Sequence, residues 1–171
     1  MVRKIVILFC LFILAQKLNA QDDVKTLSTK ERIYLGGGIN GFSIGNPTSI
    51  GFSPSIGYLT TNSTVLGVSV TYQYYKYNNA SSSLLGKSLF IKQFLPIFDE
   101  RIGPLYLTGQ VENYSQLDNS SAKYSTPILI GIGSGNRTGT NISVLYDINY
   151  SANVASPYGG AWVVQLGGLY F

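Results

Sequence analysis

The chain has 171 residues, with 12 Lys and Arg against 8 Asp and Glu, and it contains one cysteine and no histidine. This length corresponds to one domain. The absence of histidine excludes a Ser-His-Asp triad and a histidine metal site. The basic residues form no cluster, which argues against a nucleic-acid-binding face.

Residues 1–20 read MVRKIVILFCLFILAQKLNA and have the pattern of a secretory signal peptide. Arg3 and Lys4 precede an apolar run that ends at Ala15, and the small residue Ala20 closes the segment. The run is too short for a membrane helix, which takes ~20 apolar residues. We therefore expect export of the chain and cleavage after Ala20.

Cleavage changes the composition of the exported chain. It removes Arg3, Lys4 and Lys17, so the basic residues fall from 12 to 9 against 8 acidic ones and the net charge becomes +1. Cys10 is lost as well, so we expect no disulfide. We expect residues 21–31 to be a short, flexible lead-in and residues 32–171 to form the domain.

Beyond the lead-in, apolar residues alternate with Gly, Ser, Thr, Asn and Gln, which is the period of a half-buried strand. From Val65 to Tyr77, one face carries Leu66, Val68, Val70, Tyr72 and Tyr74, and the other carries Gly67, Ser69, Thr71, Gln73 and Tyr75. Polar breaks separate such segments. The pattern predicts eight strands, Arg32–Ser43, Ser49–Leu59, Val65–Tyr77, Ser83–Leu95, Pro104–Tyr114, Thr126–Gly135, Thr140–Ser151 and Gly159–Phe171.

The polarity of the two strand faces separates two possible architectures. A soluble barrel or sandwich places its apolar residues inside. Here the second face is small and polar, which makes a poor dry core but a suitable lumen if the apolar face meets lipid. The sequence therefore predicts an all-β, eight-stranded antiparallel up-and-down transmembrane β-barrel. A soluble secreted β-barrel that binds a small ligand is the alternative.

Strand alternation also predicts which side chains point into the lumen. The polar and charged residues expected there are Lys92, Glu112, Asp147, Gln73 and Gln110. Because an unpaired charge is costly in such a place, we expect a carboxylate to neutralise Lys92; the alternative is that Lys92 faces outward and snorkels at the rim. The large residues expected to fill the narrow interior are Tyr34, Tyr75, Tyr106 and Tyr114.

The chain resembles a known family in four segments. These are IYLGGGINGFS as first strand, SPSIGYLTTNSTVLGVSVTYQY as second hairpin, SLFIKQFLPIFDERIGPLYLTGQVENY as central hairpin, and the closing LYF. They are similar to the small outer-membrane β-barrel proteins of Gram-negative bacteria, in particular the Bacteroidota-type outer membrane protein β-barrel domain, itself similar to the OmpA and OmpX barrels. In one departure, the family commonly has an Arg followed by aromatics where this chain has Lys92, Gln93 and Phe94.

The resemblance implies a place in the outer membrane, contact with its lipid, and a periplasmic lead-in. It also implies insertion by the barrel-assembly machinery, which in such families reads a C-terminal aromatic signal. The residues that correspond to that signal here are Leu169, Tyr170 and Phe171.

The closing strand contains a conflict between two signals. Hydropathy turns Trp162, Val164 and Leu166 toward lipid, whereas the terminal signal turns Leu169 and Phe171 toward lipid. These sets have opposite parity, and a slip of one residue exchanges the two faces of a strand. We therefore expect a β-bulge at the two glycines 167 and 168, where it would cost least; a straight strand is the alternative.

The sequence favours a function without catalysis, cofactor or metal. General-base chemistry at neutral pH usually falls to histidine, which is absent. Asp99 and Glu100 read as a solvated turn, and LGGGING lacks the lysine of a phosphate-binding loop. We expect a structural or interaction protein of the outer membrane, with a lumen filled by side chains and short loops that contact a protein or surface partner. A narrow small-molecule conduit is the alternative.

Overall fold

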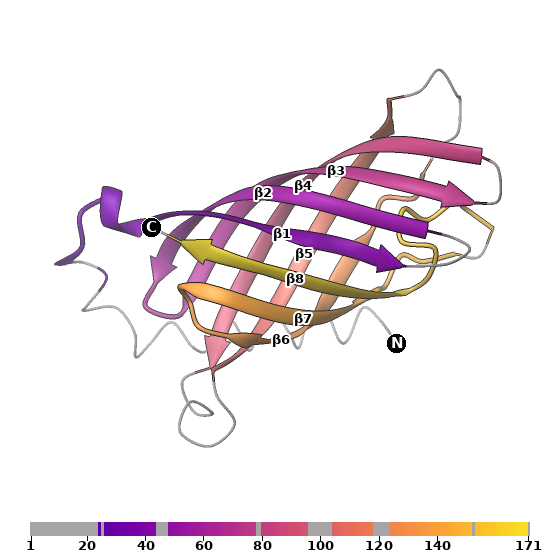
Figure 1. Cartoon of the computed structure of the whole chain (residues 1–171). Helices are drawn as coiled ribbons and strands as arrows, with labels where there is room; N and C mark the ends of the chain where they lie inside the picture. The colour runs from indigo at the N-terminus through magenta and orange to yellow at the C-terminus, as the bar shows by residue number, and fades with distance from the viewer. Residues whose placement is uncertain are drawn as a thin grey trace.

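The structure, a computed structural model, describes residue 24 and residues 26–43, 48–77, 80–95, 104–117, 124–151 and 153–170. Eight antiparallel strands follow one another in sequence order and close into a barrel, because β8 pairs with β1 (Figure 1). The strands are β1 (Ile33–Ser43), β2 (Thr48–Thr61), β3 (Thr64–Tyr77), β4 (Ala80–Leu95), β5 (Leu105–Gln116), β6 (Ile128–Gly135), β7 (Gly139–Asp147) and β8 (Trp162–Tyr170). A short 3₁₀ helix, η2 (Lys30–Arg32), precedes β1.

The predicted all-β, eight-stranded up-and-down barrel is confirmed, and each predicted strand coincides with an observed one to within a few residues. Strands β2, β3 and β4 have 14, 14 and 16 residues, whereas β6, β7 and β8 have 8, 9 and 9. The barrel wall is therefore taller on the β2–β4 side (Figure 1). We call the end where β1 begins and β8 ends the terminus end, and the opposite end the far end.

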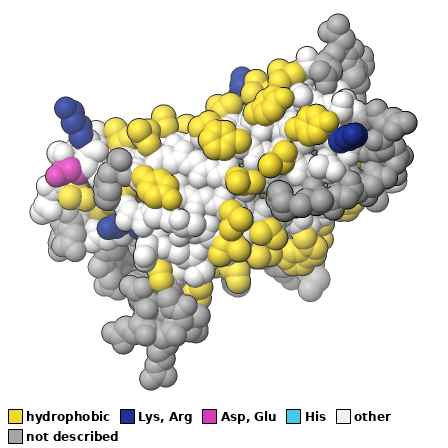
Figure 2. Space-filling model, in the orientation of Figure 1, with side chains coloured by type: hydrophobic (Ala, Val, Ile, Leu, Met, Phe, Trp, Pro, Cys, Tyr) yellow, Lys and Arg dark blue, Asp and Glu magenta, His cyan; other side chains and the backbone are white. Residues whose placement is uncertain are grey.

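Side chains alternate between the two faces of the wall, as strand geometry requires. On β3 the outward residues are 36 to 49% exposed, namely Leu66, Val68, Val70, Tyr72 and Tyr74. Ser69, Thr71 and Gln73 on the inward face are at most 9% exposed. Figure 2 shows hydrophobic side chains spread over the face of the wall that is in view, with few charged groups among them. The barrel thus has an apolar outer face and an interior in which polar side chains are mixed with apolar and aromatic ones.

Four inward aromatic side chains lie opposite glycines on a neighbouring strand. The cross-strand pairs are Tyr34 with Gly57, Phe90 with Gly67, Tyr106 with Gly133, and Tyr114 with Gly86. A Cβ atom added to Gly67 or Gly133 would lie 2.2 Å from the partner ring, and one added to Gly86 would lie 2.6 Å from it. The rings of Phe90, Tyr106 and Tyr114 therefore occupy the space that their partner glycines leave open, which allows large side chains to fill an eight-stranded interior.

The bulge expected at Gly167 and Gly168 is wrong. The ladder of β8 runs without a register shift against β7 from Trp162 to Leu169, and against β1 from Gln165 to Tyr170. Strict alternation leaves Leu169 inside, 2% exposed, and Tyr170 outside, 51% exposed. The premise that Leu169 faces outward is therefore incorrect. Phe171 lies outside the described residues.

The physical reason is the environment at the terminus end of the interior. Leu169 packs there with other buried apolar side chains, which we call the apolar cluster: Val24, Tyr34, Leu59, Val65, Phe90 and Leu169. An inward leucine at this level is stabilised by burial of apolar surface. Because Leu169 is stable on the inward face, β8 can keep a regular alternation and does not require a bulge.

The described part of the lead-in is ordered against the barrel, although the sequence predicts a flexible segment. Val24 is 5% exposed and belongs to the apolar cluster, with Leu27 packed beside it. The Arg32 guanidinium donates hydrogen bonds to the carbonyl oxygens of Val24 and Leu27. The lead-in thus supplies two apolar side chains, Val24 and Leu27, to the terminus end, and the Arg32 guanidinium holds its backbone there.

Candidate functional site

The barrel interior is the candidate site because polar side chains from all sides of the wall converge in it. Near its middle, Asn40 Nδ2 donates to Ser53 Oγ over 2.6 Å, and Ser53 Oγ lies 2.7 Å from Thr71 Oγ1. The hydroxyls of Ser69 and Ser88 are 2.5 Å apart. These hydrogen bonds satisfy polar groups that the barrel removes from bulk water.

The structure places the interior residues predicted from sequence at several levels of the barrel. The predicted polar residues are buried, with Gln73, Glu112, Asp147 and Gln110 exposed by 0, 1, 1 and 8%. Glu112 and Gln110 belong to one hydrogen-bonded group, whereas Asp147 lies at the far end of β7 and Lys92 nearer the terminus end. They do not form a single constellation.

A hydrogen-bonded group around Glu112 closes the far end. Tyr158, from the segment between β7 and β8, donates its hydroxyl to Glu112 Oε2 and lies 2.9 Å from the Tyr114 hydroxyl. Gln110 Nε2 donates to Glu112 Oε1. We call these four residues, Gln110, Glu112, Tyr114 and Tyr158, the tyrosine–glutamate cluster.

The segment between β7 and β8 is drawn into the interior by this cluster. The Tyr158 ring meets the Tyr114 ring edge-on, with centroids 6.1 Å apart, and packs against the buried residues Leu129 and Leu145. The preceding Pro157 carbonyl accepts a hydrogen bond from Gln73 Nε2 at 2.5 Å. Burial first, and then the Glu112 carboxylate, raise the pKa of Tyr158 well above its ordinary value, so the hydroxyl keeps the proton that it donates.

Asp147 holds the backbone at the far end of β7. Its Oδ1 accepts hydrogen bonds from the backbone N–H groups of Ile128 and Asn149, at 3.1 and 2.9 Å. Its Oδ2 is buried without a hydrogen-bond partner. The carboxylate therefore fixes the backbone at the start of β6 and at the start of the β7–β8 segment.

The predicted neutralisation of Lys92 by a carboxylate is wrong. Lys92 does point inward, but its Nζ donates to Asn141 Oδ1 over 3.2 Å and lies 5.0 Å from the centroid of the Tyr106 ring. Lys92 stands opposite Thr108, four residues before Glu112 on β5, which is about 13 Å along the strand. This separation is the reason that the two charges do not pair.

The next two residues of β4, Gln93 and Phe94, make contacts at the terminus end of the wall. Gln93 Nε2 donates to Ser63 Oγ over 3.0 Å in the β2–β3 turn, and Gln93 Oε1 accepts from Thr64 over 2.7 Å. Phe94 packs against the Tyr106 ring with centroids 5.3 Å apart. Gln93 and Phe94 thus help to close the terminus end of the barrel. They belong to the segment in which this chain departs from the family that it resembles.

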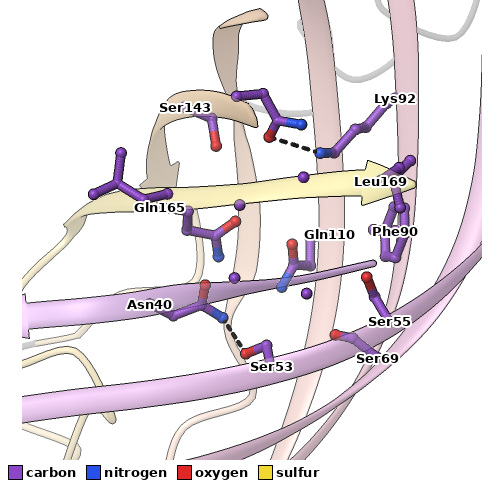
Figure 3. A pocket seen from close by; sticks show the side chains of 16 residues that line it. Asn40, Ser53, Ser55, Ser69, Phe90, Lys92, Gln110, Ser143, Gln165 and Leu169 are labelled. Atoms are coloured by element: carbon purple, nitrogen blue, oxygen red, sulfur yellow. Dashed lines mark hydrogen bonds between the residues drawn. The ribbon is translucent and has the colours of Figure 1, made fainter. Parts of the chain in front are cut away.

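A small polar cavity lies between the apolar cluster and the tyrosine–glutamate cluster. Its volume is about 60 Å³, and Lys92, Gln110, Asn141 and Gln165 are among its lining residues. In Figure 3 the side chains of Gln165, Gln110, Asn40 and Lys92 converge on it from different strands. Neither Glu112 nor Asp147 lines it. The cavity is large enough for a few water-sized molecules.

Sequence reasoning missed Val24, Asn141 and Tyr158. Asn141 carries an alternation signal, since it lies on the inward face of β7. Val24 and Tyr158 lie outside the strands, where alternation predicts nothing. A single apolar or aromatic residue in a loop gives no sequence pattern that would place its side chain inside a barrel.

The described residues contain no group of three or more His, Cys, Asp or Glu side chains that could hold a metal ion. In the same ranges, no helix is both long enough and apolar enough to cross a membrane. The interior side chains can donate and accept hydrogen bonds, and Lys92 holds a positive charge in the half of the interior nearer the terminus end.

Comparison with known protein families, with curated protein sequences and with solved structures gives no match to this chain. The fold and the geometry of the interior therefore carry the functional argument.

Proposed function

We propose that this protein is an outer-membrane β-barrel with a filled lumen, which acts as a structural or interaction protein and performs no catalysis. The observation that carries the proposal is the apolar outer wall. Each strand contributes an outward apolar residue that is 43 to 66% exposed: Leu35, Phe52, Val68, Leu89, Val111, Ile132, Val144 and Val164. Soluble monomers rarely expose a continuous apolar surface of this extent.

The height of the apolar belt fits a bilayer. From Leu66 to Tyr74 on β3, eight residue steps at ~3.3 Å span about 26 Å along the strand, or about 20 Å across a membrane at the usual strand tilt of ~40°. Outer-membrane barrels have an apolar band of ~25 Å. Tyr146 and Trp162 form an edge-on pair on the outer wall, with centroids 5.0 Å apart, in keeping with an interfacial aromatic girdle.

Two exposed lysines on the strands bear on this placement. Lys76 lies near the far end of β3, whereas Lys87 stands opposite Val70 on β3 and opposite Asn113 on β5, where outward residues on β5 change from apolar to polar. Long basic side chains at the edge of an apolar belt extend their charge toward water. Lys76 fits the edge of the belt, whereas Lys87 adjoins the position of Val70 within the belt on β3.

The filled interior favours a structural or interaction role over a conduit. The apolar cluster occupies the terminus end, and the β7–β8 segment occupies the far end. A solute path would require both to be displaced. Partners would then be lipid, the barrel-assembly machinery during insertion, and a protein or surface that meets the far-end loops.

A pair of charge substitutions tests the membrane placement. Val68→Arg puts a charge on the outward face within the belt, and we expect it to destabilise the inserted barrel by about 2–4 kcal/mol. Ser81→Arg, an exposed position beyond the belt on β4, is the control and should have little effect. Folding in lipid vesicles, followed by the mobility difference between heated and unheated samples, measures both.

If the barrel is soluble, Val68→Arg should cost no more stability than Ser81→Arg. If Val68→Arg folds as well as Ser81→Arg and the protein fractionates with the soluble periplasm, the membrane proposal fails. Planar-bilayer recordings test the closed lumen separately. We expect no steady single-channel current, and such a current would favour the conduit.

A further inference from the structure

Lys92 carries a positive charge into the interior without a carboxylate beside it. Its described contacts are the Asn141 Oδ1 atom and the rings of Phe90 and Tyr106, whose centroids lie 5.9 and 5.0 Å from Nζ. An ammonium group can donate three hydrogen bonds, and one is accounted for here. Lys92 is partly buried, and a charge in such a place that lacks a counter-charge is costly.

The hydrogen bonds of Asn141 fix the orientation of its amide. Lysine can only donate, so the Asn141 atom in contact with Lys92 is the oxygen. The Tyr106 hydroxyl donates to the same oxygen over 3.1 Å. Asn141 Nδ2 is consequently left over, and it is buried without a hydrogen-bond partner in a residue that is 5% exposed.

Gln165 provides a second buried donor without a partner. Its Nε2 makes no hydrogen bond, and its side chain reaches toward the cavity from β8 (Figure 3). Lys92, Asn141 and Gln165 all line the same cavity of about 60 Å³, whereas the carboxylates of Glu112 and Asp147 do not. Unpaired buried donors in a native structure call for an explanation, such as an ion that has not been seen.

We propose that this cavity binds a small monovalent anion of the size of chloride. Lys92 supplies the counter-charge, and the amides of Asn141 and Gln165 supply neutral donors. The single cation matches a single negative charge, and a cavity of about 60 Å³ suits a small ion. The inference goes beyond the proposed function and holds whether or not the barrel has a structural role.

The test uses the mature barrel folded in detergent micelles, with bromide as the probe. Crystals grown in bromide should show an anomalous scattering peak within hydrogen-bonding distance of Lys92 Nζ. In solution, bromide should raise the unfolding temperature relative to gluconate at equal ionic strength. By mass action, a hundredfold excess over Kd multiplies the folding equilibrium constant about a hundredfold.

Variants distinguish a built site from general salt effects. Lys92→Gln should abolish the bromide-dependent rise, and Gln165→Leu should reduce it if Lys92→Gln does not fold. Lys87→Gln is the matched control, because Lys87 lies on the same strand and faces outward. It should retain the full effect.

Three results would overturn the proposal. The first is a cavity that contains only water in the bromide crystals. The second is equal stability in bromide and gluconate. The third is a peak together with a bromide effect that survives Lys92→Gln or is undiminished in Gln165→Leu, which would identify an adventitious ion only.

Discussion

The two ends of the barrel interior are closed by different interactions. At the terminus end, the apolar cluster packs side chains of five strands around Val24 from the lead-in. At the far end, Tyr158 enters from a loop and is held by hydrogen bonds to Glu112 and Tyr114. Both closures use a residue from outside the strands. The closure at the terminus end depends on how well apolar side chains fill the space, whereas the closure at the far end depends on hydrogen-bond partners.

This difference predicts how each end responds to change. Apolar packing loses stability in proportion to the volume removed, and the loss spreads through the wall because the strands themselves carry the cluster. A buried polar network is sensitive to single atoms, since an orphaned donor or acceptor keeps its full desolvation cost. Damage at the far end should stay local, because the plug there is a loop.

The largest effect is expected from a cavity at the terminus end. Phe90→Ala removes a ring that is 8% exposed and should lower the free energy of unfolding by about 3–5 kcal/mol. The neighbouring Leu89, which is 66% exposed on the outer face, provides the control as Leu89→Ala. Urea unfolding in a constant detergent measures both, and equal losses would contradict the assignment of the two faces.

A second substitution tests the space beneath the same ring. Gly67→Ala places a methyl group 2.2 Å from the Phe90 ring and 2.6 Å from the Ile56 carbonyl oxygen, so it should destabilise by about 1–3 kcal/mol. Gly160→Ala, where an added Cβ meets nothing within 4 Å, is the control.

A double mutant distinguishes the clash with the Phe90 ring from the clash with the Ile56 carbonyl oxygen. If the ring is the main obstacle, Gly67→Ala should cost less when Phe90 is replaced by Leu than when Phe90 is present. Additive losses would show that the contact with the Ile56 carbonyl decides the cost.

At the far end, Tyr158→Phe deletes one hydroxyl and leaves Glu112 without that donor. We expect a local loss of about 1–3 kcal/mol, seen as faster hydrogen exchange and protease cleavage between β7 and β8. The unfolding midpoint of the whole barrel should change little. Tyr150→Phe, at a residue that is 38% exposed, should leave exchange unaltered; a protected loop in Tyr158→Phe would show that apolar packing alone holds it.

The smallest effect is expected for the lead-in. Val24→Ala removes two methyl groups from the apolar cluster and should release the segment by about 1–1.5 kcal/mol. Lys30→Ala, at an exposed position of η2, is the control. Exchange of the Leu27 amide, which bonds to the Val24 carbonyl, reports the release. Unchanged exchange in Val24→Ala would mean that Arg32 alone anchors the lead-in.

The sequence by itself determined the barrel. Alternation of period two on segments such as Val65–Tyr77 shows which face is apolar, because successive strand residues must point to opposite sides. The same rule places Gln73, Gln110, Glu112 and Asp147 inside. Local periodicity was sufficient for these assignments because each depends on backbone geometry within one strand.

Only the tertiary structure decided which interior groups meet. Lys92 pairs with Asn141 and not with a carboxylate because the register of β4 against β5 separates it from Glu112. Leu169 faces inward because the lumen is apolar at that level. Val24 and Tyr158 enter the interior from loops, whose paths follow from packing partners distant in the sequence. Such contacts join residues far apart in the sequence, as Gln73 and Pro157 do across 84 positions, and no local pattern records them.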